Sequence, residues 1–212
     1  DDQYRVDDAK VDISQAFTPE SGTFDRSKVT VYELIAEASA RRLERSIAPF
    51  VAISLDNIPS NGDFLKSQLK KFSVRLDPET AALIGNIQTP NTMVDRITPA
   101  PTAEFKDEVE VRLGVRDEGA ISAEPYRQLV IEHLPQAGLL PPIDTVPGVK
   151  FVDDVKPFEA AKIKMLTGSH MMMGALGRVA GFETVDQCMA DQDMGAFTKR
   201  FMAEVAATID PI

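Results

Sequence analysis

The strongest constraint on the fold is the order in which helical and strand-like segments alternate between residues 30 and 98. Thr30 and Glu33 match a capping box, and apolar residues then recur at helical spacing, which predicts a helix to about Ile47. The following segment 49–55, PFVAISL, is short, apolar and rich in β-branched residues, as a parallel strand buried on both faces would be. This order predicts an α/β sheet.

The same alternation continues along the first half of the chain. Four apolar residues recur at helical intervals and define one stripe of a second helix: Leu65, Leu69, Phe72 and Leu76. A shorter helix is expected over 78–87, and the segment 92–98, TMVDRIT, is typical of a strand. The first 28 residues mix short apolar stretches with glycine and charged positions, which predicts irregular strands. This half therefore corresponds to the later part of an open α/β sheet.

The second half changes from strands to helices. The segment 126–133, YRQLVIEH, indicates one more strand, and the proline-rich stretch 135–147 predicts a loop or linker. A long helix is expected over 157–181, with the final glycine as its stop, and two further helices follow. We therefore predict an α/β domain over 1–100 and a mainly helical domain over 101–212.

Composition and charge exclude several classes of protein. The 212 residues are 43% hydrophobic, which suffices for a core, and the net charge of -10 opposes a phosphate-binding surface and so excludes nucleic acid as a partner. The single Cys188 cannot form an internal disulfide, and every apolar run is much shorter than the roughly 20 residues of a membrane span. We expect a cytoplasmic protein without a membrane partner. With only His133 and His170 as histidines, and no HExxH or CxxC spacing, a metal site is not expected.

The segment KIKMLTGSH, residues 162–170, holds the side chains best suited to proton transfer. On one α-helix, Lys162 and His170 would lie about 80° apart in azimuth and about 12 Å apart along the axis, so both could line one cleft. Thr167 would neighbour the imidazole across one turn. Apolar neighbours favour a partly desolvated amine, as a general base requires. The alternative is a surface lysine with a histidine that packs in the core or caps the helix.

Three ordered segments resemble the mannitol dehydrogenase family, the polyol-specific long-chain dehydrogenases and reductases. The segment 156–191, KPFEAAKIKMLTGSHMMMGALGRVAGFETVDQCMAD, resembles the family signature. The segments 54–66, SLDNIPSNGDFLK, and 89–101, TPNTMVDRITPAP, are also similar and stand in the right order. The resemblance implies a metal-independent enzyme that uses NAD or NADP to interconvert a sugar alcohol and a ketose, or an aldonate and a keto-uronate.

The resemblance also implies a fold. It places the end of a Rossmann-like dinucleotide-binding domain in the first half of the chain and a mainly α-helical substrate domain after it. Family members carry a Gly-rich loop after their first strand, and GxGxxG is absent from this sequence. GALGRVAG, at 174–181, falls within the predicted helix. Together with an opening DDQYRVDD in place of methionine, this predicts an internal portion of a longer dehydrogenase.

The resemblance assigns roles to the signature helix. Lys162 matches the general acid/base that acts on the reacting hydroxyl or carbonyl, and His170 matches a residue that shapes the substrate site. Thr167 stands where the family has asparagine, and a hydroxyl offers fewer donors and a shorter reach than an amide. This departure leaves open a second interpretation, a noncatalytic member that binds a ligand or serves as an interaction module.

Residues near the predicted strand ends complete the expected site. Asn57 and Asp95 match family residues that contact both substrate and cofactor, and Val94 is expected to contact the cofactor. The carboxyl ends of strands are where open α/β sheets bind ligands. The alternative for Asn57 and Asp95 is a turn-stabilising role, which is common for such side chains. The sugar, the choice between NAD and NADP, and the oligomeric state stay open at this point.

Overall fold

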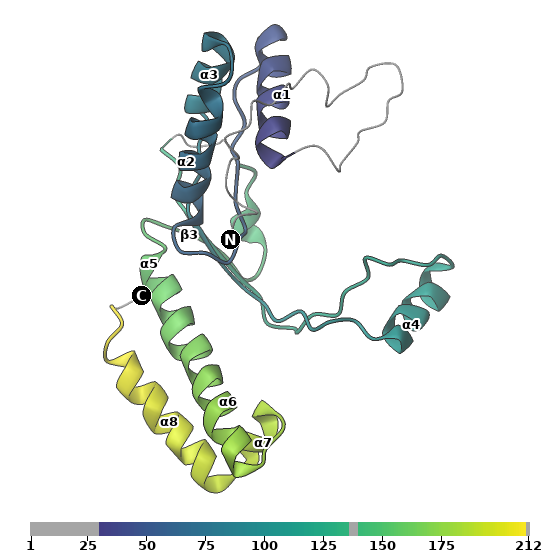
Figure 1. Ribbon diagram of the computed structural model, residues 1–212, viewed down its shortest axis with the longest axis vertical. Helices are drawn as coiled ribbons and strands as arrows, with labels where there is room; N and C mark the ends of the chain where they lie inside the picture. The colour runs from purple at the N-terminus through teal and green to yellow at the C-terminus, as the bar shows by residue number, and fades with distance from the viewer. Residues whose placement is uncertain (1–29, 136–139, 211–212) are drawn as a thin grey trace. The chain divides into compact units, whose positions relative to one another are not determined.

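The computed structural model describes residues 30–135 and 140–210, and over these residues the chain forms two compact units. The first unit contains the described residues up to Thr92 and those within 133–143, and the second contains 93–132 and the described residues from Asp144 onward. Figure 1 traces the chain through its elements. The irregular strands expected in the first 28 residues lie outside the described residues. The domain boundary expected near residue 100 stays a prediction.

The first unit is built from three helices. They are α1 (Val31–Glu44), α2 (Asn61–Ser73) and α3 (Pro78–Gly85). The Thr30 hydroxyl accepts a hydrogen bond from the Glu33 amide, and the Glu33 carboxylate accepts one from the Thr30 amide, so the predicted capping box is confirmed. All three helices contribute to one core: Tyr32, Ala36, Ala52, Leu69, Phe72, Ile84 and Ile87. The predicted stripe of α2 therefore faces this core.

The strand predicted over 49–55 forms only in part. Its pairing within the described residues is one isolated parallel bridge between Val51 and Gln88, where the Ala52 amide donates to the Gln88 carbonyl at 3.0 Å. Parallel pairing is thus present at one bridge, but a strand of seven residues is not formed, and the predicted burial is limited to Ala52, while Leu55 is exposed. Strand assignment requires a ladder of partners, and an apolar β-branched run cannot by itself supply them.

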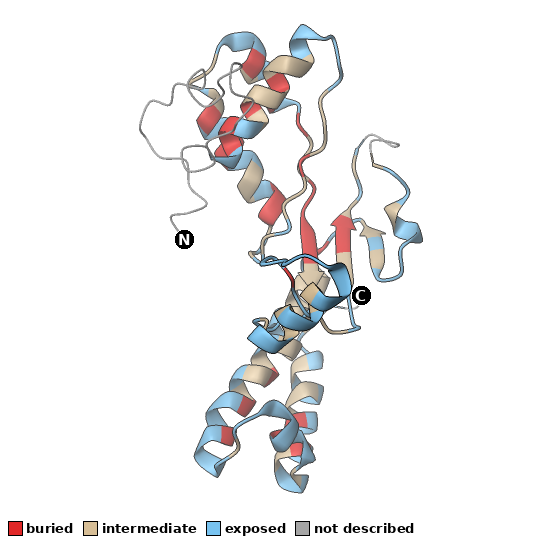
Figure 2. Cartoon of the chain, turned by 90° about the vertical axis from the view of Figure 1, so that its right-hand side faces the viewer, coloured by how far each residue is buried: buried red, intermediate tan, exposed pale blue. Residues whose placement is uncertain are grey.

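A three-stranded sheet belongs largely to the second unit. Its order is β1 (Thr92–Asp95), β2 (Gln128–Glu132) and β3 (Val149–Val152), and β2 pairs in parallel with β3. The first two strands confirm the predicted strands at 92–98 and 126–133, whereas β3 falls just after the predicted linker and was not expected. Buried residues gather on the helices of the first unit and along the strands (Figure 2).

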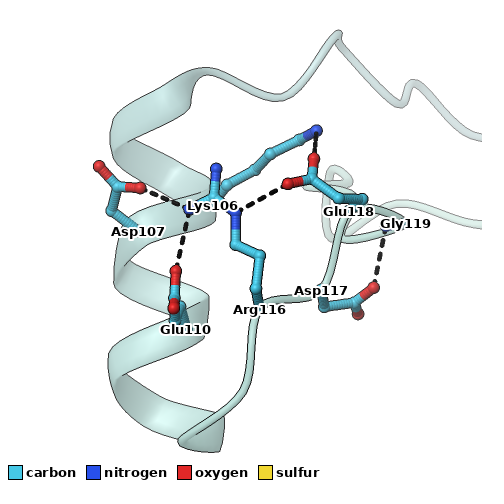
Figure 3. Close-up of polar contacts among 7 residues, drawn as sticks. All are labelled: Lys106, Asp107, Glu110, Arg116, Asp117, Glu118 and Gly119. Carbon is cyan, nitrogen blue, oxygen red and sulfur yellow. Dashed lines mark hydrogen bonds and ion pairs between the residues drawn. The ribbon is translucent and has the colours of Figure 1, made fainter.

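The charged stretch between β1 and β2 forms a helix that periodicity did not reveal. This helix, α4 (Ala103–Leu113), has no buried residue. Its sequence therefore does not show the wide apolar stripe from which a helix is usually predicted. Gly114 ends the helix in the left-handed conformation, and ion pairs add to this cap. Arg116 contacts Asp107 at 2.5 Å, Glu110 at 3.1 Å and Glu118 at 2.9 Å, which ties the following turn back onto the helix (Figure 3).

The last part of the chain is helical, as predicted. The helices are α5 (Lys156–Ala161), α6 (Gly168–Ala180), α7 (Val185–Ala190) and α8 (Gln192–Ala206), and a short 3₁₀ turn, Ile143–Thr145, precedes β3. Gly181 ends α6 in the left-handed conformation with φ of 88°, which confirms the predicted stop. The long helix differs from prediction at one place, because a π-helical turn, Lys162–Thr167, separates α5 from α6. Figure 1 shows α6 and α8 running side by side.

Candidate active site

A pocket of about 500 Å³ opens in the second unit beside the π-helical turn. Its walls come from the carboxyl end of β1, the beginning of β2, Lys150 of β3 and the helices α5 and α8, together with the turn itself. The lining residues are Asp95, Ile97, Glu124, Tyr126, Gln128, Lys150, Phe158, Ala161, Lys162, Met165, Leu166 and Met202. The pocket therefore combines an apolar helical wall with polar groups from the strand ends, as ligand sites commonly do.

The predicted proton-transfer lysine occupies this pocket. Lys162 is the first residue of the π-helical turn, and its Nζ donates a hydrogen bond to the backbone carbonyl of Val94, 68 positions away in sequence. Val94 and Asp95 end strand β1. The fold thus brings Lys162, Val94 and Asp95 together, as the site prediction requires, and anchors the amine at the end of a strand.

The π-helical turn changes the geometry expected for the signature helix. Wider i→i+5 turns shift the angular phase, so the azimuth of about 80° calculated for an α-helix does not apply between Lys162 and His170. Thr167, the last residue of this turn, is exposed. Neither Thr167 nor His170 is among the residues that line the pocket around Lys162. Single π-helical turns within α-helices occur frequently at functional sites.

His170 is half-buried and has a defined ring orientation. Its Nδ1 lies 2.8 Å from the carbonyl oxygen of Leu166. Because a carbonyl oxygen only accepts, Nδ1 donates in this contact and carries a proton. In the neutral ring, Nε2 is then the acceptor nitrogen. The bond to Leu166 fixes the tautomer and leaves Nε2 as the nitrogen suited to a ligand hydroxyl.

Asn57 lies in the first unit, on an exposed part of the loop that precedes α2. The loop is held by the buried side chain of Asn61, which sequence reasoning passed over. Its Nδ2 lies 3.2 Å from the carbonyl oxygen of Ser54, 3.0 Å from that of Asp56 and 2.9 Å from Thr92 Oγ1, and these three acceptors share its two N–H groups. The sequence did contain a signal for this residue, because Asn61 precedes Gly62 in the segment SNG. An asparagine that only stabilises a turn would give the same sequence pattern.

The glycine after Asn61 lets α2 approach the chain that leads into β1. A Cβ at Gly62 would lie 2.4 Å from the carbonyl oxygens of both Thr89 and Pro90. The Asn91 side chain completes the contact, since its Oδ1 accepts from the Asp63 amide at 2.9 Å. The loop that carries Asn57 is therefore fixed to the beginning of β1 by close packing and buried hydrogen bonds.

The pocket also contains polar residues that sequence reasoning did not select. The Tyr126 hydroxyl donates to Gln128 Oε1 at 3.2 Å, and burial, followed by the charges of Asp95 and Glu124, raises the pKa of this phenol. Both carboxylates therefore act on Tyr126. Lys150 adds a second amine, 5.9 Å from the centroid of the Phe158 ring.

The described residues show neither a cluster of metal ligands nor a membrane-spanning helix. Among them, no three or more His, Cys, Asp or Glu side chains group together as a metal site would require. None of the helices in 30–135 and 140–210 combines the length and apolar character needed to cross a bilayer. Metal independence stays a prediction.

Comparison with known proteins identifies the family. Residues 10–145 match the mannitol dehydrogenase Rossmann domain, and residues 154–212 match the mannitol dehydrogenase C-terminal domain. The chain belongs to the mannitol dehydrogenase family. The predicted fold class is confirmed: a Rossmann-like domain is followed by a mainly helical one.

Individual relatives agree with this assignment. The chain is 43% identical over 152 residues to D-mannonate oxidoreductase of Escherichia coli, an alignment that covers 71% of this chain and 31% of that protein. A crystal structure of D-sorbitol dehydrogenase in substrate-free form matches with a TM-score of 0.78 and 30% identity, over 99% of this chain and 44% of the other. Mannitol 2-dehydrogenase of Pseudomonas fluorescens was solved as a ternary complex with NAD and D-mannitol. It matches with a TM-score of 0.67 and 32% identity, over 86% of this chain and 37% of the other. The chain spans about a third of the length of the curated relatives it matches.

Proposed function

We propose that the protein containing this chain is an NAD- or NADP-dependent oxidoreductase of sugar derivatives. It interconverts a sugar alcohol with a ketose, or an aldonate with a keto-uronate, and Lys162 is its general acid/base. The observation that carries the proposal is the position of the Lys162 amine, held by the Val94 carbonyl in a pocket that also contains Asp95. The two relatives with solved structures are polyol dehydrogenases by name, which supports the same class of reaction.

The strand-end residues fit one part of a dinucleotide site. β1 ends at Asp95, which faces the pocket, and Asn57 is exposed on a loop held rigidly by Asn61. We assign Val94 and Asp95 to the nicotinamide end of the cofactor, because they form the carboxyl end of β1 and such strand ends hold the ligand in open α/β folds. We assign Asn57 to the cofactor on the family resemblance. When bound, the cofactor supplies the hydride acceptor or donor. The Gly-rich loop for its pyrophosphate has no counterpart in this sequence.

Lys162 moves the proton. In oxidation the neutral amine accepts the proton of the substrate hydroxyl, and in reduction the ammonium returns it to the carbonyl oxygen. The Val94 carbonyl accepts an N–H from Lys162, and either protonation state of the amine can donate this bond. The amine therefore keeps its position throughout the proton transfer. Such fixed positioning is part of what makes general acid/base catalysis effective.

The remaining predicted residues act on the substrate. We assign Asp95 to a substrate hydroxyl, because an ionised carboxylate accepts such donors. We assign His170 to another hydroxyl through Nε2, since its Nδ1 is committed to Leu166. We assign Thr167 to the substrate on the family resemblance alone, because its exposed side chain does not line the Lys162 pocket.

Replacing Lys162 tests the proposal in the full-length protein. Lys162→Met removes the amine but keeps an unbranched stem, and turnover of ketoses and hexuronates with NADH or NADPH should fall at least ~100-fold. Binding of the reduced cofactor, followed by its fluorescence, should change little. Lys164→Met is the matched control, since Lys164 is exposed in the same turn and its ammonium bonds the Thr208 carbonyl. Near-normal turnover in Lys162→Met would reject the role.

The alternative is a noncatalytic family member that retains ligand binding or serves as an interaction module. It is favoured by Thr167, which replaces the family's asparagine, is exposed and does not line the Lys162 pocket. Failure of the wild-type protein to turn over any ketose or hexuronate with either cofactor would support it. Activity gained in Thr167→Asn would then identify this position as the cause.

A cytoplasmic location stays a prediction from the single cysteine.

A further inference from the structure

Lys150 brings a second positive charge to the Lys162 pocket. It lies on β3, is exposed, and stacks its ammonium over the Phe158 ring at 5.9 Å from the centroid. Among the residues that the structure describes, no carboxylate pairs with this ammonium. Within the described part of the chain, the contact recorded for this ammonium is the face of the Phe158 ring.

The position of Lys150 is related to that of Lys162 through the helix. Phe158, under the Lys150 ammonium, precedes Lys162 by four residues, and the Lys162 amide bonds the Phe158 carbonyl in the α-helical manner. Residues four apart on an α-helix lie on one face, with Cβ atoms about 5–6 Å apart. Both amines therefore face the pocket, Lys162 towards the Val94 carbonyl of β1 and Lys150 from β3 over the ring of Phe158.

The other polar groups of the pocket are acceptors. Asp95 and Glu124 both bear on Tyr126, and Glu124 is fixed because its Oε1 accepts the Ile97 amide at 2.6 Å. Such carboxylates accept hydrogen bonds from sugar hydroxyls but repel a carboxylate ligand. Among the residues that line the pocket, only Lys150 and Lys162 are suited to a negatively charged group. A ligand with hydroxyls along its chain and an anion at one end would match both sets of partners.

We propose that Lys150 binds the carboxylate of the substrate, and that the enzyme therefore acts on a sugar acid, an aldonate or keto-uronate, in preference to an uncharged polyol or ketose. The inference rests on the proposed function of Lys162 and adds a specificity-determining residue to it. A charge-assisted bond from ammonium to carboxylate is stronger than a bond between neutral groups. A hexitol presents only a hydroxyl at that end of its chain, and so leaves the Lys150 charge uncompensated.

The test compares substrates that differ only at one end. D-mannonate and D-mannitol form such a pair, and other epimeric hexonates with their hexitols extend the panel. In the full-length protein, Lys150→Gln should lower kcat/KM for the hexonate about tenfold, mainly through KM, because a partly exposed charged contact is lost. The value for the hexitol should change less than about twofold, since no charged contact is lost there. Lys150→Arg should restore hexonate turnover, and Lys156→Gln, which removes an exposed lysine outside the pocket, should leave both values unchanged.

A hexitol preference in the wild type, or a Lys150→Gln variant with an unaltered hexonate to hexitol ratio, overturns the inference while leaving the role of Lys162 intact. Calorimetric titration with D-mannonate gives an independent readout if no substrate is turned over. In that case the proposed function fails, and the inference is judged by binding alone. Binding weakened about tenfold in Lys150→Gln supports a carboxylate site, whereas equal binding in both proteins, or none, refutes it.

Discussion

Removing the buried amide of Asn61 should destabilise the first unit and disturb the loop that carries Asn57. Asn61 is 1% exposed, and besides the three acceptors that share its two N–H groups, its Oδ1 accepts a hydrogen bond from the Thr92 amide at 2.9 Å. In Asn61→Ala the Asp56 carbonyl and the Thr92 amide both lose this partner. The Ser54 carbonyl keeps a bond from Thr92 Oγ1 at 2.7 Å, so it is compensated.

The magnitude follows from the two groups left without that partner. A buried donor or acceptor deprived of its hydrogen bond costs about 1–3 kcal/mol, so Asn61→Ala should lower the free energy of unfolding by about 2–4 kcal/mol. Partial access of water to the Asp56 carbonyl keeps the total below the sum of two full penalties. Asn61→Asp retains the acceptor for Thr92 but loses the donors and buries a carboxylate, so it should not rescue stability.

The assay is urea unfolding followed by circular dichroism, with Asn86→Ala as the control. Asn86 is an exposed asparagine at the end of α3, and its replacement should cost less than about 0.5 kcal/mol. If Asn61→Ala unfolds at the same urea concentration as Asn86→Ala, the buried network does not hold the loop, and this account of how Asn57 is positioned is wrong.

Two further predictions concern packing and charge. Gly62→Ala should lower the free energy of unfolding in urea by about 2 kcal/mol. The new Cβ would contact the backbone oxygens of Thr89 and Pro90, which cannot move aside as a side chain can. An unchanged urea midpoint would contradict this. Hydrogen bonds from Lys106 and then Arg116 lower the pKa of Glu118 from 4.5 to about 2. Since this folded-state pKa is depressed, the contribution of Glu118 to the order of α4 is complete above pH 4.5 and is lost as the pH falls towards 2. An NMR titration should find that low midpoint in the wild type, and a midpoint near 4.5 would show that the ion pairs do not form in solution.

The amino-acid sequence by itself determined the features that depend on near neighbours. The capping box of Thr30 and Glu33, the glycine stop at Gly181 and the apolar stripe of α2 are each set within a few residues, and all were predicted correctly. Local signals of this kind act over one or two helical turns, so a short window of sequence contains them. The helix α4 shows the limit of this reasoning, because it buries nothing: Thr102 and Gly114 cap it, and ion pairs around Arg116 join its end to the following turn.

The tertiary structure decided whatever required distant segments to meet. The strand expected over 49–55 became one bridge, because pairing depends on a partner segment as well as on β-branched residues. The π-helical turn changed the angle about the helix axis between Lys162 and His170. The sequence pattern, which indicated an unbroken α-helix, could not show this change. Likewise, contact between Lys162 and Val94, and the presence of Lys150 in the same pocket, arise from the order of the sheet and its packing against α5. The sequence was sufficient to name the side chains with suitable chemistry. The distances that bring these side chains together in one site exist only in the folded chain.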